Sequence, residues 1–309
     1  MASNTMQVER SKLSLWMQAI RPFAYSASVI PVLIGAIGSL VFFNGTVDWY
    51  LFPIILLAAV LFHTGSNLVS EYFDYKKGVD TVDAFGSSRI LVDNLLTDRA
   101  VLFGGILTFI VGFALGLILV YVRGLDILYL GLMGLVAGAF YTVKPFQFKY
   151  IALGDLLIFF AFGPLLVLGS YFGLTGEMNW NIIWASIPSS FLIVAIVHAN
   201  NTRDIKHDNA AKIKTLAGLI GIKGAKAEYY FLVTGAYIVT AALVAFGILD
   251  WYMAVVFVTL PGAIKNIKMF SKATLDNPEE IAMMDILTAQ HHMQFGLLFV
   301  IGMLLTALL

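Results

Sequence analysis

The chain has 309 residues, of which 60% are hydrophobic and 12% are charged, and its mean hydropathy is +0.87. A soluble globular domain is about half apolar and about one quarter charged, so this composition indicates a membrane protein. The formal net charge is zero, which gives no reason to expect a nucleic-acid partner. Because there is no cysteine, disulfides, thiolate metal sites and a cysteine nucleophile are excluded.

Nine apolar segments are long enough to span a bilayer, which takes about 20 apolar residues per helix. The predicted spans are 20–43, 51–73, 100–121, 127–143, 151–173, 182–201, 229–248, 250–267 and 292–309. Their residues do not alternate between apolar and polar, as those of a membrane barrel would. The sequence therefore predicts an all-α integral membrane protein of one domain, 1–309, with about nine transmembrane helices. Residues 1–19 form an N-terminal tail that includes an amphipathic helix at the membrane interface.

The basic residues predict how the chain is oriented. With a cytoplasmic N-terminus, Arg123 is the one basic residue of 19 that falls in an outer loop. Lysine and arginine favour the cytoplasmic side of a membrane. The longest connections, near 74–99, 202–228 and 268–291, lie on that same side, and long loops are often functional. We therefore expect a multi-pass protein of the cell (inner) membrane with its active site at the cytoplasmic face.

The end of the second predicted span carries a cluster of polar residues. Asn67, Glu71 and Asp74 stand at positions i, i+4 and i+7, so on a helix they share one face. Asp80 follows in the next loop, after a glycine. This pattern predicts an acidic stripe at the cytoplasmic end of the helix.

The end of the sixth predicted span repeats that pattern. Asn200, Asp204 and Asp208 stand at i, i+4 and i+8, with Asn201 and Arg203 between them. The two clusters lie four spans apart, and an even number of crossings places both on the same side of the membrane. The spans therefore form a parallel internal repeat in which each half contributes one acidic stripe to a shared cavity.

Two facing carboxylate stripes are typical of a magnesium site. Magnesium takes oxygen ligands and is usually held by one or two carboxylates together with substrate phosphates. Two such sites would clamp a diphosphate and neutralise it as a leaving group. Basic residues on the same face would bind the remaining phosphate oxygens, and the candidates are Arg89, Lys144, Arg203 and Lys212. The alternative is that these acids are ordinary helix-end charges that pair with the basic loops, but acids near lipid are costly without a use.

Aromatic and histidine residues are less specific signals. Tyr141 begins Tyr-Thr-Val-Lys-Pro at an inner helix end, where its ring would either stabilise a carbocation or simply pack. His63 and His198 lie inside spans and are expected to be hydrogen-bonded structural residues. Asn277-Pro278-Glu279-Glu280 is a good helix start and predicts a lid helix. The His291-His292 pair that follows lacks the further ligands that a zinc site requires.

The chain resembles the UbiA superfamily of membrane prenyltransferases over nearly its whole length. Its likeness is greatest to the branch that prenylates 1,4-dihydroxy-2-naphthoate for menaquinone. The segments that carry the resemblance are Arg21-Pro22, Pro31 to Gly35, Asn67-Leu68-Val69, Tyr72-Phe73-Asp74, Gly78-Val79-Asp80, Leu91-Val92-Asp93, Phe148-Lys149-Tyr150, Leu153-Gly154-Asp155, Phe162-Gly163-Pro164, Asn200-Asn201-Thr202-Arg203-Asp204, Asp208 and Thr215-Leu216-Ala217. The sequence departs from the family at Ser70-Glu71, where Asn-Asp is common, and at Lys212, where glycine is usual.

The resemblance implies nine helices around a central cavity that opens toward the cytoplasm and lipid. It implies that Asp74, Asp80, Asp204 and Asp208 hold Mg²⁺ and a diphosphate. Asn67, Asn200 and Asn201 would support that site as metal and substrate residues. Glu71, which shares a helix face with Asn67 and Asp74, is a further candidate for binding the substrate. The expected reaction transfers a prenyl chain from a polyprenyl diphosphate to an aromatic acceptor, with decarboxylation of the naphthoate. The alternatives are another acceptor, such as 4-hydroxybenzoate or a lipid alcohol, and, from a different class, a secondary transporter with repeated halves.

Overall fold

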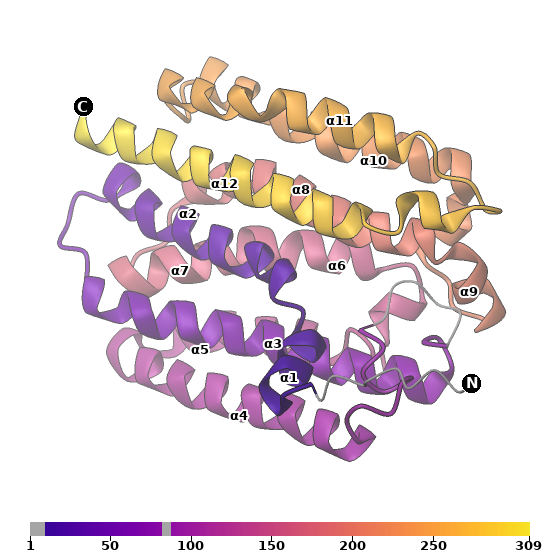
Figure 1. Ribbon diagram of the computed structural model, residues 1–309. Helices are drawn as coiled ribbons and strands as arrows, with labels where there is room; N and C mark the ends of the chain where they lie inside the picture. The colour runs from indigo at the N-terminus through magenta and orange to yellow at the C-terminus, as the bar shows by residue number, and fades with distance from the viewer. Residues whose placement is uncertain (1–9, 82–87) are drawn as a thin grey trace, which may run out of the picture.

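Eight helices in the described part of the chain are long and apolar enough to cross a membrane. In this computed structural model, residues 10–81 and 88–309 are described, and the long helices lie roughly side by side (Figure 1). The helices are α1 Lys12–Ile20, α2 Ser26–Phe42, α3 Phe52–Lys77, α4 Asp98–Arg123, α5 Leu125–Ala139, α6 Gly154–Phe160, α7 Leu166–Thr175, α8 Trp180–Arg203, α9 Ile205–Ala210, α10 Leu216–Ala245, α11 Leu260–Phe270 and α12 Met284–Leu308. The all-α membrane fold predicted from the sequence is confirmed.

The number and the bounds of the spans need adjustment. The fourth predicted span corresponds to α5, which has only 15 residues and is shorter than the other eight. The fifth is divided into α6 and α7 by a π-helical turn, Ala161–Leu165. Residues 1–9 of the predicted tail and 82–87 of the predicted loop 74–99 lie outside the described residues.

Two of the predicted loops are largely helical. α10 begins at Leu216, not at 229, and α12 begins at Met284, not at 292. The predicted lid helix at 277–291 is instead a 3-10 turn, Pro278–Ile281, that leads into α12. These extensions carry charged residues, so an apolar run of membrane-spanning length does not include them.

The end of α3 turns the chain back on itself. Gly78 adopts φ +73°, and its N–H bonds to the carbonyls of Asp74 and Tyr75. A left-handed glycine of this kind is the common way to end a helix, because it satisfies carbonyls that the helix leaves unpaired. The N–H of Val79 also bonds to the Asp74 carbonyl, at 2.9 Å. This turn brings Asp80 back toward the last turn of α3.

A glycine also lets α8 approach the break between α6 and α7. A Cβ atom on Gly163 would lie 1.8 Å from the Ser190 hydroxyl on α8, so no other residue fits without movement. Gly163 itself has non-helical φ and ψ, and Pro164 follows it. The break positions Phe162 and Leu166 at the wall of an internal cavity.

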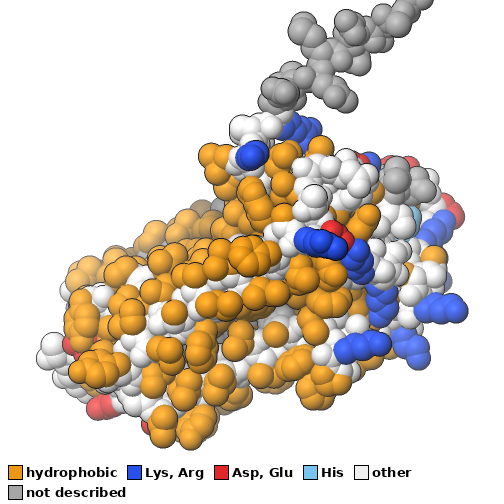
Figure 2. Space-filling view, turned by 90° about the horizontal axis from the view of Figure 1, so that it is seen from below, with side chains coloured by type: hydrophobic (Ala, Val, Ile, Leu, Met, Phe, Trp, Pro, Cys, Tyr) orange, Lys and Arg blue, Asp and Glu red, His pale blue; other side chains and the backbone are white. Residues whose placement is uncertain are grey.

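The surface divides into an apolar face and a charged end. Figure 2 shows apolar side chains over most of the visible face, with the visible Lys and Arg side chains gathered mainly toward one end. Phe103, Ile110 and Tyr121 on α4 are among the exposed large apolar side chains. An apolar surface of this extent suits contact with lipid.

Candidate active site

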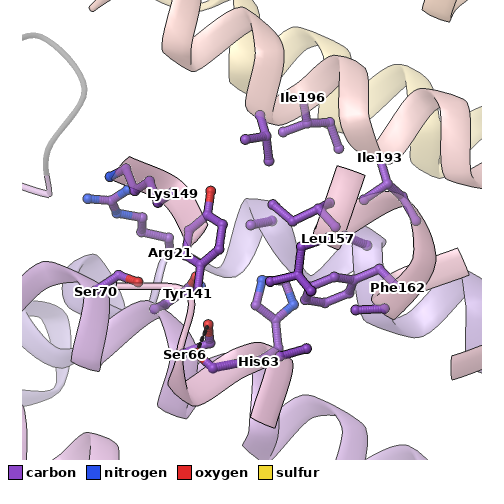
Figure 3. Close-up of a pocket in the computed structure, with 18 of the residues that line it drawn as sticks. Arg21, His63, Ser66, Ser70, Tyr141, Lys149, Leu157, Phe162, Ile193 and Ile196 are labelled. Carbon is purple, nitrogen blue, oxygen red and sulfur yellow. Dashed lines mark hydrogen bonds between the residues drawn. The ribbon is translucent and has the colours of Figure 1, made fainter. Parts of the chain in front are cut away.

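A cavity with a volume of ≈ 230 Å³ opens between α3, α5, α6 and α8. One side of it is polar and the other is apolar, as Figure 3 shows. Arg21, Tyr141 and Lys149 lie on the polar side, while Leu157, Phe162 and Ile193 lie on the apolar side. A cavity of this kind suits a molecule with a charged head and a hydrocarbon tail.

A second, smaller cavity of ≈ 30 Å³ adjoins the polar side. It is lined by Arg21, Asp74, Val79, Asp80, Lys149, Asn200, Asn201, Asp204, His207 and Asp208. Half of these residues also line the large cavity, so the two spaces share a wall. The ends of α3 and α8 therefore meet here, as the repeated pattern of the sequence predicts.

The first acidic cluster is held by a buried ion pair. Asp74 is buried, and its carboxylate accepts hydrogen bonds from Lys149 Nζ at 2.6 Å and from the Tyr150 hydroxyl at 2.7 Å. Asp80 differs, because its Oδ2 is buried without a hydrogen-bond partner among the described residues. An oxygen in this state is a strong candidate ligand for a cation.

Glu71 and Asn67 hold the segment Ile20-Arg21, which joins α1 to the turn before α2. Glu71 accepts hydrogen bonds from the Arg21 guanidinium at 2.7 Å and from the Ser88 hydroxyl at 2.5 Å. Asn67 donates to the Ile20 carbonyl at 3.2 Å. These contacts hold Arg21 where it lines both cavities.

The second acidic cluster is organised by Arg203. This buried guanidinium bonds to Asp204 at 3.0 Å, to Asp285 at 3.2 Å and to the side-chain oxygen of Asn200. It is absent from the walls of both cavities, so far as the described residues form them. Arg203 therefore orients Asn200 and Asp204 from behind the cavity walls.

Burial and mutual repulsion favour the protonated form of two of the carboxyl groups. The pKa of Asp80 is raised to about 7, first because burial disfavours its charge and then because Asp74 and Glu71 are close. Burial likewise raises the pKa of Asp208 to about 7, with Asp204 adding to the effect and Lys149 opposing it. Burial opposes the charge of Lys149, but Asp74, Tyr141, Tyr150 and Asp208 together outweigh it and hold the Lys149 pKa well above its usual value.

The donor set fits Mg²⁺. Four aspartates, Asp74, Asp80, Asp204 and Asp208, surround the small cavity with Asn200. Carboxylate and amide oxygens are the ligands that Mg²⁺ takes in proteins, together with phosphate oxygens and water. The unpartnered oxygen of Asp80 shows that the described residues alone do not satisfy this cluster.

The structure brings most of the sequence-predicted site residues together. Those that line one or both cavities are Asn67, Glu71, Asp74, Asp80, Tyr141, Asn200, Asn201, Asp204 and Asp208. Three predicted phosphate-binding residues, Arg89, Lys144 and Lys212, line neither cavity as the described residues define it. Arg89 instead pairs with Asp93 at 2.8 Å, and both side chains are more than one-third exposed.

Sequence reasoning did not select the two cations that do line the cavities. Arg21 and Lys149 lie at the polar side of both. A signal was present, because Arg21-Pro22 and Phe148-Lys149-Tyr150 are among the segments that carry the family resemblance. Their roles emerge only once Glu71 and Asp74 are seen to hold them.

The chain is similar to known proteins and to solved structures over most of its length. The chain is 32% identical to a 1,4-dihydroxy-2-naphthoate octaprenyltransferase of Bacillus subtilis, over 94% of this chain and 92% of that protein. It is 32% identical to the human UbiA prenyltransferase domain-containing protein 1, over 96% and 85% of the two chains.

Among solved structures, a UbiA homologue from Archaeoglobus fulgidus bound to GPP and Mg²⁺ superposes with a TM-score of 0.56 at 16% identity, covering 93% of this chain and 99% of that one. A digeranylgeranylglyceryl phosphate synthase superposes with a TM-score of 0.60 at 16% identity, covering 94% and 98%. The UbiA prenyltransferase family model matches residues 28–292. The chain therefore belongs to the UbiA prenyltransferase family.

Proposed function

We propose that this prenyltransferase moves a long prenyl group from a polyprenyl diphosphate to 1,4-dihydroxy-2-naphthoate, in a magnesium-dependent reaction that serves menaquinone synthesis. The observation that carries the proposal is the division of the cavity into an acidic and basic side and an apolar side. The naphthoate is supported by the name of the Bacillus relative. A transporter is less well supported, because transporter sites usually lie near the bilayer midplane and these acids lie at helix ends.

In this proposal the diphosphate binds where the two cavities meet. Asp74, Asp80, Asp204 and Asp208 would hold Mg²⁺, with Asn67 and Asn200 as further ligands, and the bound cation would neutralise the leaving group. Arg21 and Lys149 would donate hydrogen bonds to phosphate oxygens, since charged donors bind phosphate strongly. The prenyl tail would lie along Leu157, Phe162 and Ile193.

The reaction needs an electron-rich ring at the carbon that loses the diphosphate. The carbon–oxygen bond to the diphosphate breaks, and the ring carbon bearing the carboxylate forms a bond to the prenyl carbon. The carboxylate then leaves as carbon dioxide, so its bonding electrons restore the aromatic ring without removal of a proton from that carbon. The ring face of Tyr141 would stabilise positive charge on the prenyl carbon, and the apolar wall would exclude water.

We further propose that the charged end of the bundle faces the cytoplasm. The basic inner segments of the sequence support this orientation. It places the carboxylate clusters at the membrane surface, where a water-soluble diphosphate head and Mg²⁺ are accessible. The N-terminus would then be cytoplasmic and the protein a multi-pass component of the cell (inner) membrane.

Product analysis tests the acceptor. Purified protein with Mg²⁺ and a long prenyl diphosphate should convert 1,4-dihydroxy-2-naphthoate to a prenylated naphthoquinol and release carbon dioxide. With 4-hydroxybenzoate the rate should be lower by roughly 10- to 200-fold, because one ring loses apolar contact and orientation. Mass spectrometry of extracted lipids gives the answer, and a prenylated hydroxybenzoate as main product would refute the acceptor while leaving the family intact.

Substitution of Asp80 tests the metal site. Asp80→Asn keeps the size of the side chain but removes its charge, and turnover should fall by about 100-fold or more if the metal supplies several kcal/mol. Asp276→Asn is the matched control, because Asp276 is a surface acid with a 90% exposed side chain. Equal turnover in the two folded variants would remove Asp80 from the site.

The raised pKa values of Asp80 and Asp208 predict how Mg²⁺ binding depends on pH. Without the cation, the folded state holds more protons than the unfolded chain between the usual aspartate pKa of 3.8 and the folded pKa of about 7, so these groups lower stability as pH rises through that range. Magnesium should therefore stabilise the protein more at about pH 8 than at about pH 6, with an affinity gain of up to about tenfold per pH unit for each proton displaced.

Thermal unfolding in detergent, with and without Mg²⁺, measures this dependence. Asp208→Asn should weaken it, because one of the two titrating groups is then absent. A magnesium-induced shift in Tm that is the same at both pH values would contradict the assignment of these two carboxyl groups to the metal.

Accessibility of added cysteines tests the orientation. The native chain has no cysteine, so each added thiol reports alone. Lys272 and Glu177 are both exposed, the first after α11 and the second between α7 and α8. In sealed inverted vesicles, Lys272→Cys should react with an impermeant maleimide, and Glu177→Cys should react only after detergent is added. The opposite pattern would reverse the orientation, and labelling of both without detergent would refute the span assignment.

A further inference from the structure

Behind the wall of the active-site cavities, three helices bring together one histidine and two acids. Asp155 comes from the first turn of α6, His198 from α8 and Glu228 from α10. One ligand atom from each side chain lies within 4.8 Å of the others. Asp155 and His198 are buried, and the Glu228 side chain is 19% exposed. This cluster is separate from the aspartates proposed to hold Mg²⁺.

A hydrogen bond to the backbone fixes the tautomer of a neutral His198. His198 Nε2 lies 2.9 Å from the Ala225 carbonyl oxygen. A carbonyl only accepts hydrogen bonds, so Nε2 carries the hydrogen. In a neutral imidazole the lone pair of Nδ1 then points at Asp155 Oδ2, 3.3 Å away, and at Glu228 Oε2, 3.6 Å away. Three acceptors converge in this way only if a proton or a metal cation lies between them, and the spacing of the donors distinguishes the two.

The separations of His198 Nδ1 from the two carboxylates fit a tetrahedral metal ion, and all three donor atoms lie within 4.8 Å of one another. Zinc binds histidine nitrogen and carboxylate oxygen at about 2.0–2.2 Å, so neighbouring ligands of a tetrahedral site stand about 3.3–3.5 Å apart. The two measured separations of 3.3 and 3.6 Å agree with that edge. Octahedral Mg²⁺ prefers oxygen ligands, and a mixed nitrogen and oxygen set favours zinc.

The surroundings resemble those of known metal ligands. A metal-bound histidine usually donates its other N–H to a carbonyl or carboxylate, as His198 does to Ala225. Ligating carboxylates are themselves hydrogen-bonded, and Asn201 Nδ2 donates to Asp155 Oδ1 at 3.1 Å. Two carboxylates and a neutral imidazole carry two negative charges, which a divalent cation neutralises in a region where unpaired charge is costly.

We propose that Asp155, His198 and Glu228 form a zinc site that joins α6, α8 and α10, with a water molecule as the fourth ligand on the exposed side of Glu228. The bound ion also fixes Asp155 and, through it, Asn201, which lines both active-site cavities. The site is thus structural, and it supports the polar side of the cavity from behind. It does not depend on which acceptor the enzyme uses.

Metal analysis tests the proposal without an activity assay. The full-length protein is purified by a histidine-free affinity tag in buffer that contains Mg²⁺ but no chelator, and zinc per chain is measured by mass spectrometry. We expect about one zinc per wild-type chain, and a loss of at least about tenfold in His198→Asn and Glu228→Gln. Glu280→Gln, a substitution of an exposed glutamate, is the matched control and should keep its zinc.

A spectroscopic measurement on the wild-type protein tests the site even if a variant fails to fold. Zinc-depleted wild-type protein should bind Co²⁺ with the visible absorption bands of a tetrahedral site, and Glu228→Gln, altered only at a partly exposed side chain, should lose them. Wild-type protein without stoichiometric zinc and without those bands would overturn the proposal. His198 would then be an imidazolium that pairs with both acids. Equal zinc in wild type and Glu228→Gln would overturn it as well.

Discussion

The ion pair between Lys149 and Asp74 is the contact on which the polar side of the cavity depends. Four aspartates meet at the end of an apolar bundle, and their mutual repulsion must be offset for the helices to pack. Lys149 bonds to Asp74 at 2.6 Å, and Asp74 and Asp208 both favour its charge. Tyr150 adds a second hydrogen bond to Asp74. One cation from the segment after α5 thus stabilises acids from α3 and α9. The proposed Mg²⁺ would offset the negative charge that Lys149 does not.

This arrangement also explains why the helices end where they do. α3 ends in a left-handed glycine turn that returns Asp80 toward Asp74, and α8 ends beside Arg203, which orients Asn200 and Asp204. The visible Lys and Arg side chains gather mainly at one end of the bundle, while the sides that would face lipid remain apolar (Figure 2). A substrate with a diphosphate head and a hydrocarbon tail has the same division, so the architecture of the protein and that of its proposed donor substrate match.

Helical spacing was sufficient to predict the residues of the site that lie on helices, but not the cations that lie in loops. Asn67, Glu71 and Asp74 share a helix face by arithmetic alone, and they do line the cavity. The loop cations Arg89, Lys144 and Lys212 could not be placed in this way, because a loop has no period that fixes where a side chain points. Arg203 was predicted to bind phosphate, but its partner Asp285 lies 82 residues further along the chain. A pairing between residues so far apart in the sequence cannot be predicted from the local sequence pattern. The early start of α10 was missed for a related reason, since hydropathy reports burial in lipid and not helicity.

The departure at position 71 acquires a reason in this structure. The family often has aspartate there, whereas this chain has glutamate. The longer side chain accepts hydrogen bonds from both Arg21 and Ser88. Arg21 lies before α2, and Ser88 lies between α3 and α4. The Glu71 carboxylate therefore forms an ion pair with Arg21, which lines both cavities. Because Glu71 is already bonded and Asp80 Oδ2 is not, the proposed metal-binding role in the first acidic cluster suits Asp80 better than Glu71. Glu71 instead fixes the position of Arg21, the cation that we propose to bind phosphate.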